Sequence, residues 1–205
     1  MMKSLIILIM LSLMPIENVM SPEEMFILDV PSYDQQELGL PTGCEIVSLA
    51  MMINYRYSAD VTTLADQMPR SSDPNEGYRG NPYRSDGYSI FPSALMELLS
   101  DYVGNAIDMT GAEVSTLKEQ LISGAPVIVW VNGLGFVVHC ITLTGFDENG
   151  LYYNDPWTGE KSAYITDEEF YDIWNEPIYD PFNDTYHAPR MALSYTTDSD
   201  ITSSN

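Results

Sequence analysis

The residues best suited to catalytic chemistry are the cysteines and the histidines, and the chain has only two of each. Cys44 follows Thr42 and Gly43 at the expected start of a helix, where free N–H groups and the helix dipole lower the pKa of a thiol. Gly43 is expected to leave open space in front of the sulfur. The position favours a nucleophilic Cys44, although most lone cysteines are small buried residues.

A nucleophilic thiol needs a base, and His139 is the favoured candidate. It lies in the apolar run Phe136–Ile141, which predicts a rigid strand, whereas His187 lies in a loop segment. The other interpretation is a structural histidine in an apolar strand. Alternation along the strand puts Cys140 on the opposite face from His139, so we expect Cys140 in the core and not in a disulfide with Cys44.

An acid that orients the base is expected at Asp155. It follows the run Leu151–Asn154, which predicts a strand returning from the His139 strand, so the hairpin brings the two residues near each other. Asp155 could then hold one imidazole nitrogen while the other faces Cys44. A turn aspartate before Pro156 is the alternative, since that pattern is common.

Acyl transfer also needs a donor for the oxyanion. Gln35 and Gln36 lie nine and eight residues before Cys44, in the loop that leads to its helix. The side-chain amide of either residue could reach the same pocket, so both stay open on this reasoning.

Periodicity and turn signals predict the elements that must position these residues. Thr42 with Glu45, and Thr166 with Glu169, match the capping-box pattern. A long loop rich in Gly, Pro and Tyr separates two of the helices. Helices are expected at 42–53, 61–68, 92–102, 112–122 and 166–174, and strands at 26–30, 126–131, 136–144, 151–154 and 191–195. Helices in the first half and antiparallel strands in the second predict an α+β fold.

Composition narrows the function further. The chain has 205 residues, which suits one domain or at most two small ones, and 45% of them are apolar, enough for a real core. Eight Lys and Arg against 30 Asp and Glu give a net charge of −22, which argues against nucleic acid as a partner. Two cysteines cannot form a disulfide scaffold, and two histidines with two cysteines are too few for a metal-cluster fold. We expect no cofactor and no metal.

The first residues resemble a secretory signal. Lys3 precedes a short apolar run, which Pro15 and Glu17 end before it is long enough to cross a bilayer. We therefore expect a signal peptide at 1–21, a single domain at 22–195 and a disordered polar tail at 196–205. This organisation predicts a secreted or cell-envelope protein without stable membrane association beyond the signal peptide.

Several stretches carry a family resemblance: Val30-Pro-Ser-Tyr-Asp-Gln35, Leu40-Pro-Thr-Gly-Cys-Glu45, Gly80-Asn-Pro-Tyr83, Pro126-Val-Ile-Val-Trp130, His139-Cys140 and Tyr153-Asn-Asp-Pro156. Together they resemble the bacterial peptidase C39-like family, papain-like cysteine peptidases related to the peptidases that process bacteriocins at a double-glycine leader. The resemblance covers about Leu28 to Trp174. It implies a papain-like fold, with a helical half that carries the cysteine and an antiparallel sheet that carries the histidine and the aspartate.

The resemblance also implies roles. Cys44 matches the nucleophile, His139 the base, Asp155 the orienting acid, and Gln35 rather than Gln36 the oxyanion-hole glutamine. The implied activity is hydrolysis of peptide bonds in a peptide or protein substrate by a bacterial enzyme. This chain has neither the membrane domain nor the ATPase of the transporter-bound members, so processing of bacteriocin leaders does not carry over. Substrate-binding candidates around the cleft are Gly43, Tyr78, Asn81 and Tyr83.

Other functions compete with peptide hydrolysis. The same triad would serve an amidase, a deamidase or a transpeptidase. A non-catalytic peptide-binding module on the same fold is a second alternative, but it has no need of all four site residues. A calcium-stabilised secreted protein is the third, with carboxylates at Asp180–Asp184 and Asp198–Asp200 but no loop of the EF-hand type.

Overall fold

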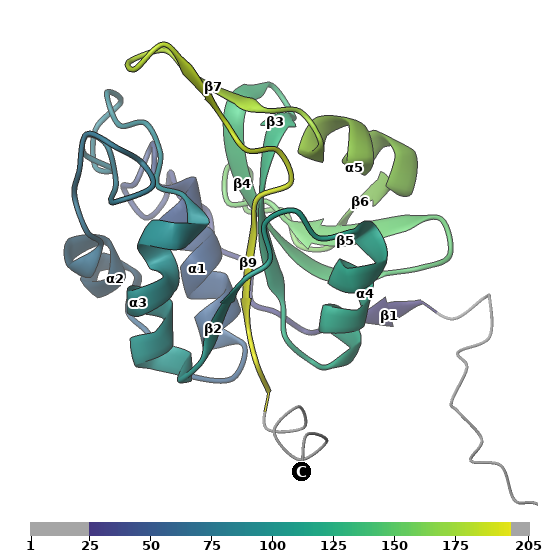
Figure 1. Cartoon of the computed structure of the whole chain (residues 1–205). Coiled ribbons are helices and arrows are strands. Elements are labelled where there is room, and N and C mark those ends of the chain that lie inside the picture. Colours follow the sequence, from purple (N-terminus) through teal and green to yellow (C-terminus); the bar gives the residue numbers. More distant parts are fainter. Residues whose placement is uncertain (1–24, 198–205) are drawn as a thin grey trace, which may run out of the picture.

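The computed structural model describes residues 25–197, which form a helical half beside a sheet (Figure 1). The helices are α1 (Cys44–Asn54), α2 (Val61–Gln67), α3 (Pro92–Val103), α4 (Val114–Ile122) and α5 (Asp167–Trp174). The strands are β1 (Phe26–Ile27), β2 (Ala106–Asp108), β3 (Val127–Gly133), β4 (Phe136–Phe146), β5 (Gly150–Asn154), β6 (Ala163–Thr166), β7 (Ile178–Asp180), β8 (Thr185–His187) and β9 (Ala192–Tyr195). The predicted signal peptide at 1–21 lies outside the described residues.

The main sheet is antiparallel, in the order β2-β9-β3-β4-β5-β6, and β1 pairs with the far end of β4. β3 and β4 form a hairpin in which Val131 pairs with His139 and Trp130 with Cys140. β5 returns along β4 with Asn154 paired to Thr142. The chain therefore leaves β5 at the end of the sheet where His139 lies, and this register brings the following residue, Asp155, beside it.

Helix α1 is the central element of the core, because every residue from Cys44 to Ile53 is buried. It packs against β3 and β4, and α4 and α5 cover the other side of the sheet (Figure 1). Two hydrogen bonds join α1 to β4: Ser48 Oγ donates to the Cys140 carbonyl at 3.2 Å, and Thr142 Oγ1 donates to the Ser48 carbonyl at 3.2 Å. Because both bonds are buried, they fix the helix that begins at Cys44 against the strand that carries His139.

A second, two-stranded sheet of β7 and β8 extends from the sheet half towards the loop between α2 and α3 (Figure 1). Tyr88 in that loop donates its hydroxyl to the Tyr179 carbonyl at 3.0 Å, and its ring meets Phe182 edge to face at 5.3 Å. Arg79 lies over the Phe182 ring at 4.3 Å. The hairpin thus anchors the loop to the sheet half.

The coarse expectation from the sequence, helices first and antiparallel strands after, is confirmed. The capping box of Thr166 and Glu169 at α5 is also present in full. The capping box predicted for α1 is wrong: Gly43 is the N-cap and no side chain caps this helix. Thr42 Oγ1 instead donates to the Arg84 carbonyl at 2.8 Å, and the Glu45 carboxylate turns into the core. Both side chains have tertiary partners, and these displace the local cap.

Four short strands, β2, β6, β7 and β8, were not expected from the sequence. Just past the predicted boundary at 195, Thr196 N donates to the Asn105 carbonyl at 3.0 Å and Thr197 Oγ1 to the Ser123 carbonyl at 3.2 Å. The rest of the predicted tail, 198–205, lies outside the described residues. Within residues 25–197, no helix combines the length and apolarity that crossing a membrane requires.

Candidate active site

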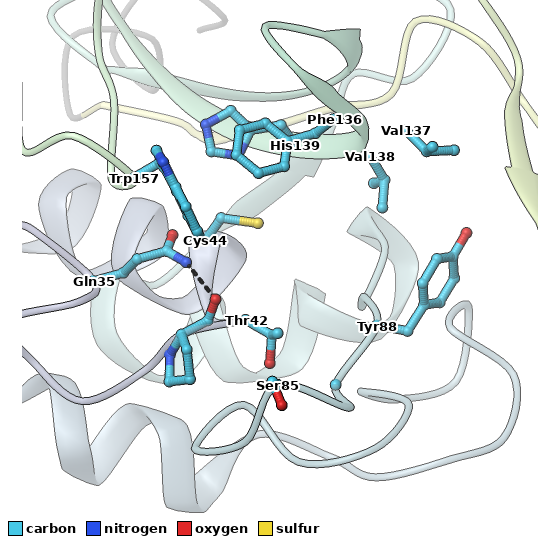
Figure 2. Close-up of a pocket in the computed structure, with 12 residues that line it drawn as sticks. Gln35, Thr42, Cys44, Ser85, Tyr88, Phe136, Val137, Val138, His139 and Trp157 are labelled. Carbon is cyan, nitrogen blue, oxygen red and sulfur yellow. Dashed lines mark hydrogen bonds between the residues drawn. The ribbon is translucent and has the colours of Figure 1, made fainter.

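A cleft of about 440 Å³ lies between the start of α1 and the start of β4 (Figure 2). Much of its wall is apolar and comes from Tyr88, Phe136, Val137, Val138 and Trp157. Three of the four residues expected to do chemistry, Gln35, Cys44 and His139, line the same cleft from three different segments. Asp155 stands behind His139.

His139 is held by Asp155. Its Nε2 atom lies 2.7 Å from Asp155 Oδ1, and the His139 side chain is almost completely buried. The backbone N–H of Trp157 donates to the same carboxylate oxygen at 2.8 Å. Burial would raise the pKa of Asp155, but the hydrogen bonds from His139 and Trp157 outweigh it and hold this pKa below its ordinary value. With Nε2 engaged, Nδ1 is the nitrogen left to exchange a proton with a thiol.

One aromatic ring covers the imidazole, and a second supports the first. Phe136 stacks on His139 with a centroid distance of 4.6 Å, and Trp157 meets Phe136 edge to face at 5.0 Å. The Phe136 ring restricts the imidazole plane and keeps water from one of its faces. Sequence reasoning missed both residues. Trp157 lies two positions after Asp155 and could have been found as a neighbour of the acid, whereas Phe136 has no such signal.

Cys44 is the first residue of α1 and is 9% exposed. Both cysteines are free thiols, in agreement with the expectation that they do not pair. Cys140 is completely buried, also as expected. Among the described residues, no hydrogen bond joins Cys44 to His139, although Figure 2 shows both side chains at the same cleft.

The predicted low pKa of Cys44 is wrong for the protein without substrate. Burial raises the pKa of this thiol well above its ordinary value, and the neighbouring Glu45 carboxylate raises it further. The backbone N–H of Cys140 acts in the opposite direction and does not outweigh them. Burial outweighs the effect of the helix end, so the neutral thiol is the favoured form.

Gln35 enters the cleft with its amide already fixed (Figure 2). Its Nε2 donates to the Pro41 carbonyl at 3.0 Å, and its backbone N–H donates to the Pro156 carbonyl at 2.8 Å. One N–H of the amide is thereby used, and the second is left over for another acceptor. Gln36 is exposed and does not line the cleft. Of the two glutamines that residue type alone left as candidates, Gln35 is therefore the one at the cleft.

Gly43 does not provide open space before the sulfur. A Cβ at this position would lie 2.9 Å from Leu40 Cβ and 3.3 Å from Ile46 Cγ2, so glycine makes room for the core. Tyr78 is also not a cleft residue, because it is 1% exposed and its hydroxyl donates to the Thr42 carbonyl at 2.5 Å. Both residues support the turn that precedes Cys44.

Asn81 and Tyr83 also lie away from the cleft. Asn81 Oδ1 accepts a hydrogen bond from Tyr83 N at 3.0 Å, and Tyr83 donates its hydroxyl to Asp66 on α2 at 2.9 Å. The loop residues that do line the cleft are Ser85, Gly87 and Tyr88. Gly87 is essential there, because a Cβ would collide with Thr42 Oγ1 and the Tyr78 hydroxyl.

The second histidine belongs to a different cluster. His187, on β8, packs edge to face on Phe91 at 4.6 Å, and its Nε2 lies 3.6 Å from Asp180 Oδ2. It is not among the cleft residues. Within residues 25–197, no group of three or more His, Cys, Asp or Glu side chains is arranged to hold a metal ion.

Comparisons with known proteins give a consistent result. Residues 27–179 match the family model of the Peptidase C39 like family. The chain is 30% identical to the uncharacterized protein YvpB of Bacillus subtilis strain 168, over 73% of this chain and 72% of that protein. It is also similar to the crystal structure of a candidate C39-like peptidase from Bacillus anthracis, with a TM-score of 0.71, 27% identity, and coverage of 85% of this chain and 98% of that one.

Proposed function

Because the chain belongs to the peptidase C39-like family, we propose that it is an exported cysteine peptidase. In this proposal Cys44 is the nucleophile, His139 the general base, Asp155 its orienting acid and Gln35 the oxyanion donor. The signal-like sequence at 1–21 supports export.

One observation carries the assignment of the site. The hydrogen bond of 2.7 Å between His139 Nε2 and Asp155 Oδ1 leaves Nδ1 free, in a cleft that Cys44 also lines. A base oriented by an acid, beside a thiol at a helix start, is the arrangement that nucleophilic catalysis requires.

The reaction follows from these groups. As Cys44 Sγ bonds to the carbonyl carbon of a substrate amide, its proton passes to His139 Nδ1. The oxyanion is held by the backbone N–H of Cys44 and by the second N–H of the Gln35 amide. The C–N bond then breaks, and His139 returns the proton to the leaving amine. Water, deprotonated by His139, attacks the thioester and releases the acid product with the Cys44 thiol.

The raised pKa of Cys44 refines this mechanism. A resting thiolate–imidazolium pair is disfavoured by burial and by the nearby Glu45 carboxylate. Proton transfer is therefore best placed within the attack itself, when His139 acts as a general base.

Hydrolysis of a mixed peptide library, followed by mass spectrometry, tests the proposal. We expect Cys44→Ala to lower the cleavage rate by at least about 10³-fold, because the nucleophile is lost, while Cys140→Ala stays close to wild type. Full activity of both Cys44→Ser and His139→Ala would contradict the mechanism.

The same assay with an added amine separates hydrolysis from transfer. Acid products alone support a peptidase, whereas amide products joined to the added amine identify a transpeptidase. Release of ammonia from glutamine or asparagine side chains, without cleavage of the peptide chain, identifies a deamidase.

A further inference from the structure

The residue that follows the nucleophile is a carboxylate in an unusual place. Glu45 lies in the first turn of α1 and is 0% exposed. Glutamate is almost never fully buried unless it is paired, because removing its charge from water is costly. Of the ion pairs formed within residues 25–197, none includes Glu45.

Glu45 is instead bound to the wall of the cleft. Its Oε1 accepts a hydrogen bond of 2.5 Å from Ser89 Oγ, which is itself completely buried. Ser89 directly follows Tyr88, a residue of the cleft wall. The next carbonyl, that of Ile90, accepts from Trp130 Nε1 of β3 at 2.9 Å. Residues 89–90 are therefore held both by α1, through Glu45, and by β3, through Trp130.

The second oxygen of the same carboxylate is left over. Among residues 25–197, Glu45 Oε2 is buried and has no partner at ordinary hydrogen-bond distance, while the Cys44 thiol and the Ile90 N–H also act on this carboxyl. A buried polar atom without a partner costs stability, so its retention calls for a compensating role. Local backbone contacts do not explain it, because Glu45 takes no part in a helix cap.

Within residues 25–197, the groups whose pKa the Glu45 charge raises are all acids. Cys44 on α1, Tyr78 and Tyr88 in the loop, and Cys140 on β4 all have a raised pKa, first from burial and then in part from the Glu45 charge. Burial also raises the pKa of Glu45 itself, against the hydrogen bond from Ser89. A thiolate here would add a second negative charge next to Glu45, and His139, in the same cleft, is the group that can take up the proton.

We propose that Glu45 is a positioning residue of the thiol site, which fixes the cleft wall through Ser89 and restrains Cys44 from losing its proton. The inference rests on the proposed role of Cys44 as nucleophile. The restraint is electrostatic, since a thiolate beside a buried carboxylate places two like charges in a medium that screens them poorly. Cys44 then loses its proton only when His139 receives it during attack on a substrate.

The test is the pH profile of Cys44 alkylation by iodoacetamide, read by mass spectrometry in the full chain. Glu45→Gln keeps an acceptor for Ser89 but removes the charge. We expect Cys44 in this variant to react about tenfold faster near pH 7, with its midpoint moved to lower pH. Cys140 in the same sample is the internal control. Glu37→Gln, at an exposed glutamate, is the matched control and should follow wild type.

A second variant keeps the proposal testable if Glu45→Gln does not fold, and far-UV circular dichroism checks the folding of both variants. Ser89→Ala removes the donor that stabilises the Glu45 carboxylate, so the carboxyl is protonated over a wider pH range. Cys44 should again react faster than in wild type, by less than in Glu45→Gln. A purely structural role predicts no shift of the midpoint in either variant.

The outcomes separate the two proposals, because alkylation does not require peptide hydrolysis. A lower midpoint for Cys44 supports the restraint even if no peptide is cleaved, in which case the peptidase proposal fails alone. An unchanged or higher midpoint in folded Glu45→Gln or Ser89→Ala overturns the restraint, even if peptides are cleaved.

Discussion

The two sides of the cleft hold their reactive side chains by different physical means. On the sheet side, His139 is bonded to Asp155 and stacked on Phe136, and the acid has a further donor in the Trp157 N–H. On the helix side, the buried oxygens Gln35 Oε1 and Glu45 Oε2 have no hydrogen-bond partner within the part of the chain that the structure describes. The base is therefore hydrogen-bonded to its acid before substrate arrives, whereas the side of the nucleophile keeps hydrogen-bonding groups that are not used.

This difference indicates where the substrate completes the site. A satisfied hydrogen-bond network is rigid and needs nothing from a ligand. The helix side keeps a neutral thiol and a spare amide N–H, and both gain their partners only when a carbonyl group enters the cleft. Substitutions on the two sides should consequently change different properties of the protein.

The largest effect is expected from His139→Ala, which removes the base from the organised side. Peptide hydrolysis should fall by at least about 10³-fold, because no other histidine lines the cleft. His187→Ala is the control, and steady-state kinetics on one cleaved peptide measures both variants. Equal losses in the two variants would remove the distinction between the histidines.

A smaller effect is expected from Gln35→Ala on the helix side. Loss of one oxyanion donor should lower kcat by roughly 10²-fold with little change in KM, because the donor acts on charge that develops only in the transition state. Gln36→Ala, one position away and exposed, should match wild type. An increase in KM alone would assign Gln35 to substrate binding instead.

The smallest effect concerns stability on the sheet side. The pKa of Asp155 is lowered in the folded protein, so the stabilisation from its charged hydrogen bonds is present above the unfolded value and is lost as pH falls through the folded one. At pH 7, Asp155→Asn should lose about 2 kcal/mol, which corresponds to roughly 4–8 °C in Tm. The difference from wild type should shrink in thermal melts as pH falls below about 4, the ordinary value for Asp. A difference that stays constant below that pH would mean that charge is not the cause.

The sheet side was the more predictable of the two. The apolar run Phe136–Thr144 and the turn before Leu151 predict a hairpin, and the period of a strand then places Asp155 near His139. Both patterns depend only on neighbouring residues, and both form the predicted strands in the folded chain. The distance between His139 and Asp155 follows from strand register, which the hydrophobic pattern specifies.

On the helix side, the predictions were wrong where tertiary contacts decide which partners a side chain binds. Thr42 and Glu45 have the spacing of a capping box, yet their partners are Arg84 and Ser89, about 40 residues away along the chain. The aromatic residues of the long loop, such as Tyr78, gave no sign of which would face the cleft. Loop conformation depends on such distant partners, so spacing alone cannot supply it.

Trp157 gives the molecule its own optical reporter. It is 41% exposed at the rim of the cleft, whereas Trp130 and Trp174 are 1% and 0% exposed, and the chain has no other tryptophan. Indole emission depends on contact with water, so the fluorescence that responds to an added quencher arises chiefly from the cleft. Binding of a ligand in the cleft can therefore be measured by tryptophan fluorescence even before any substrate is known.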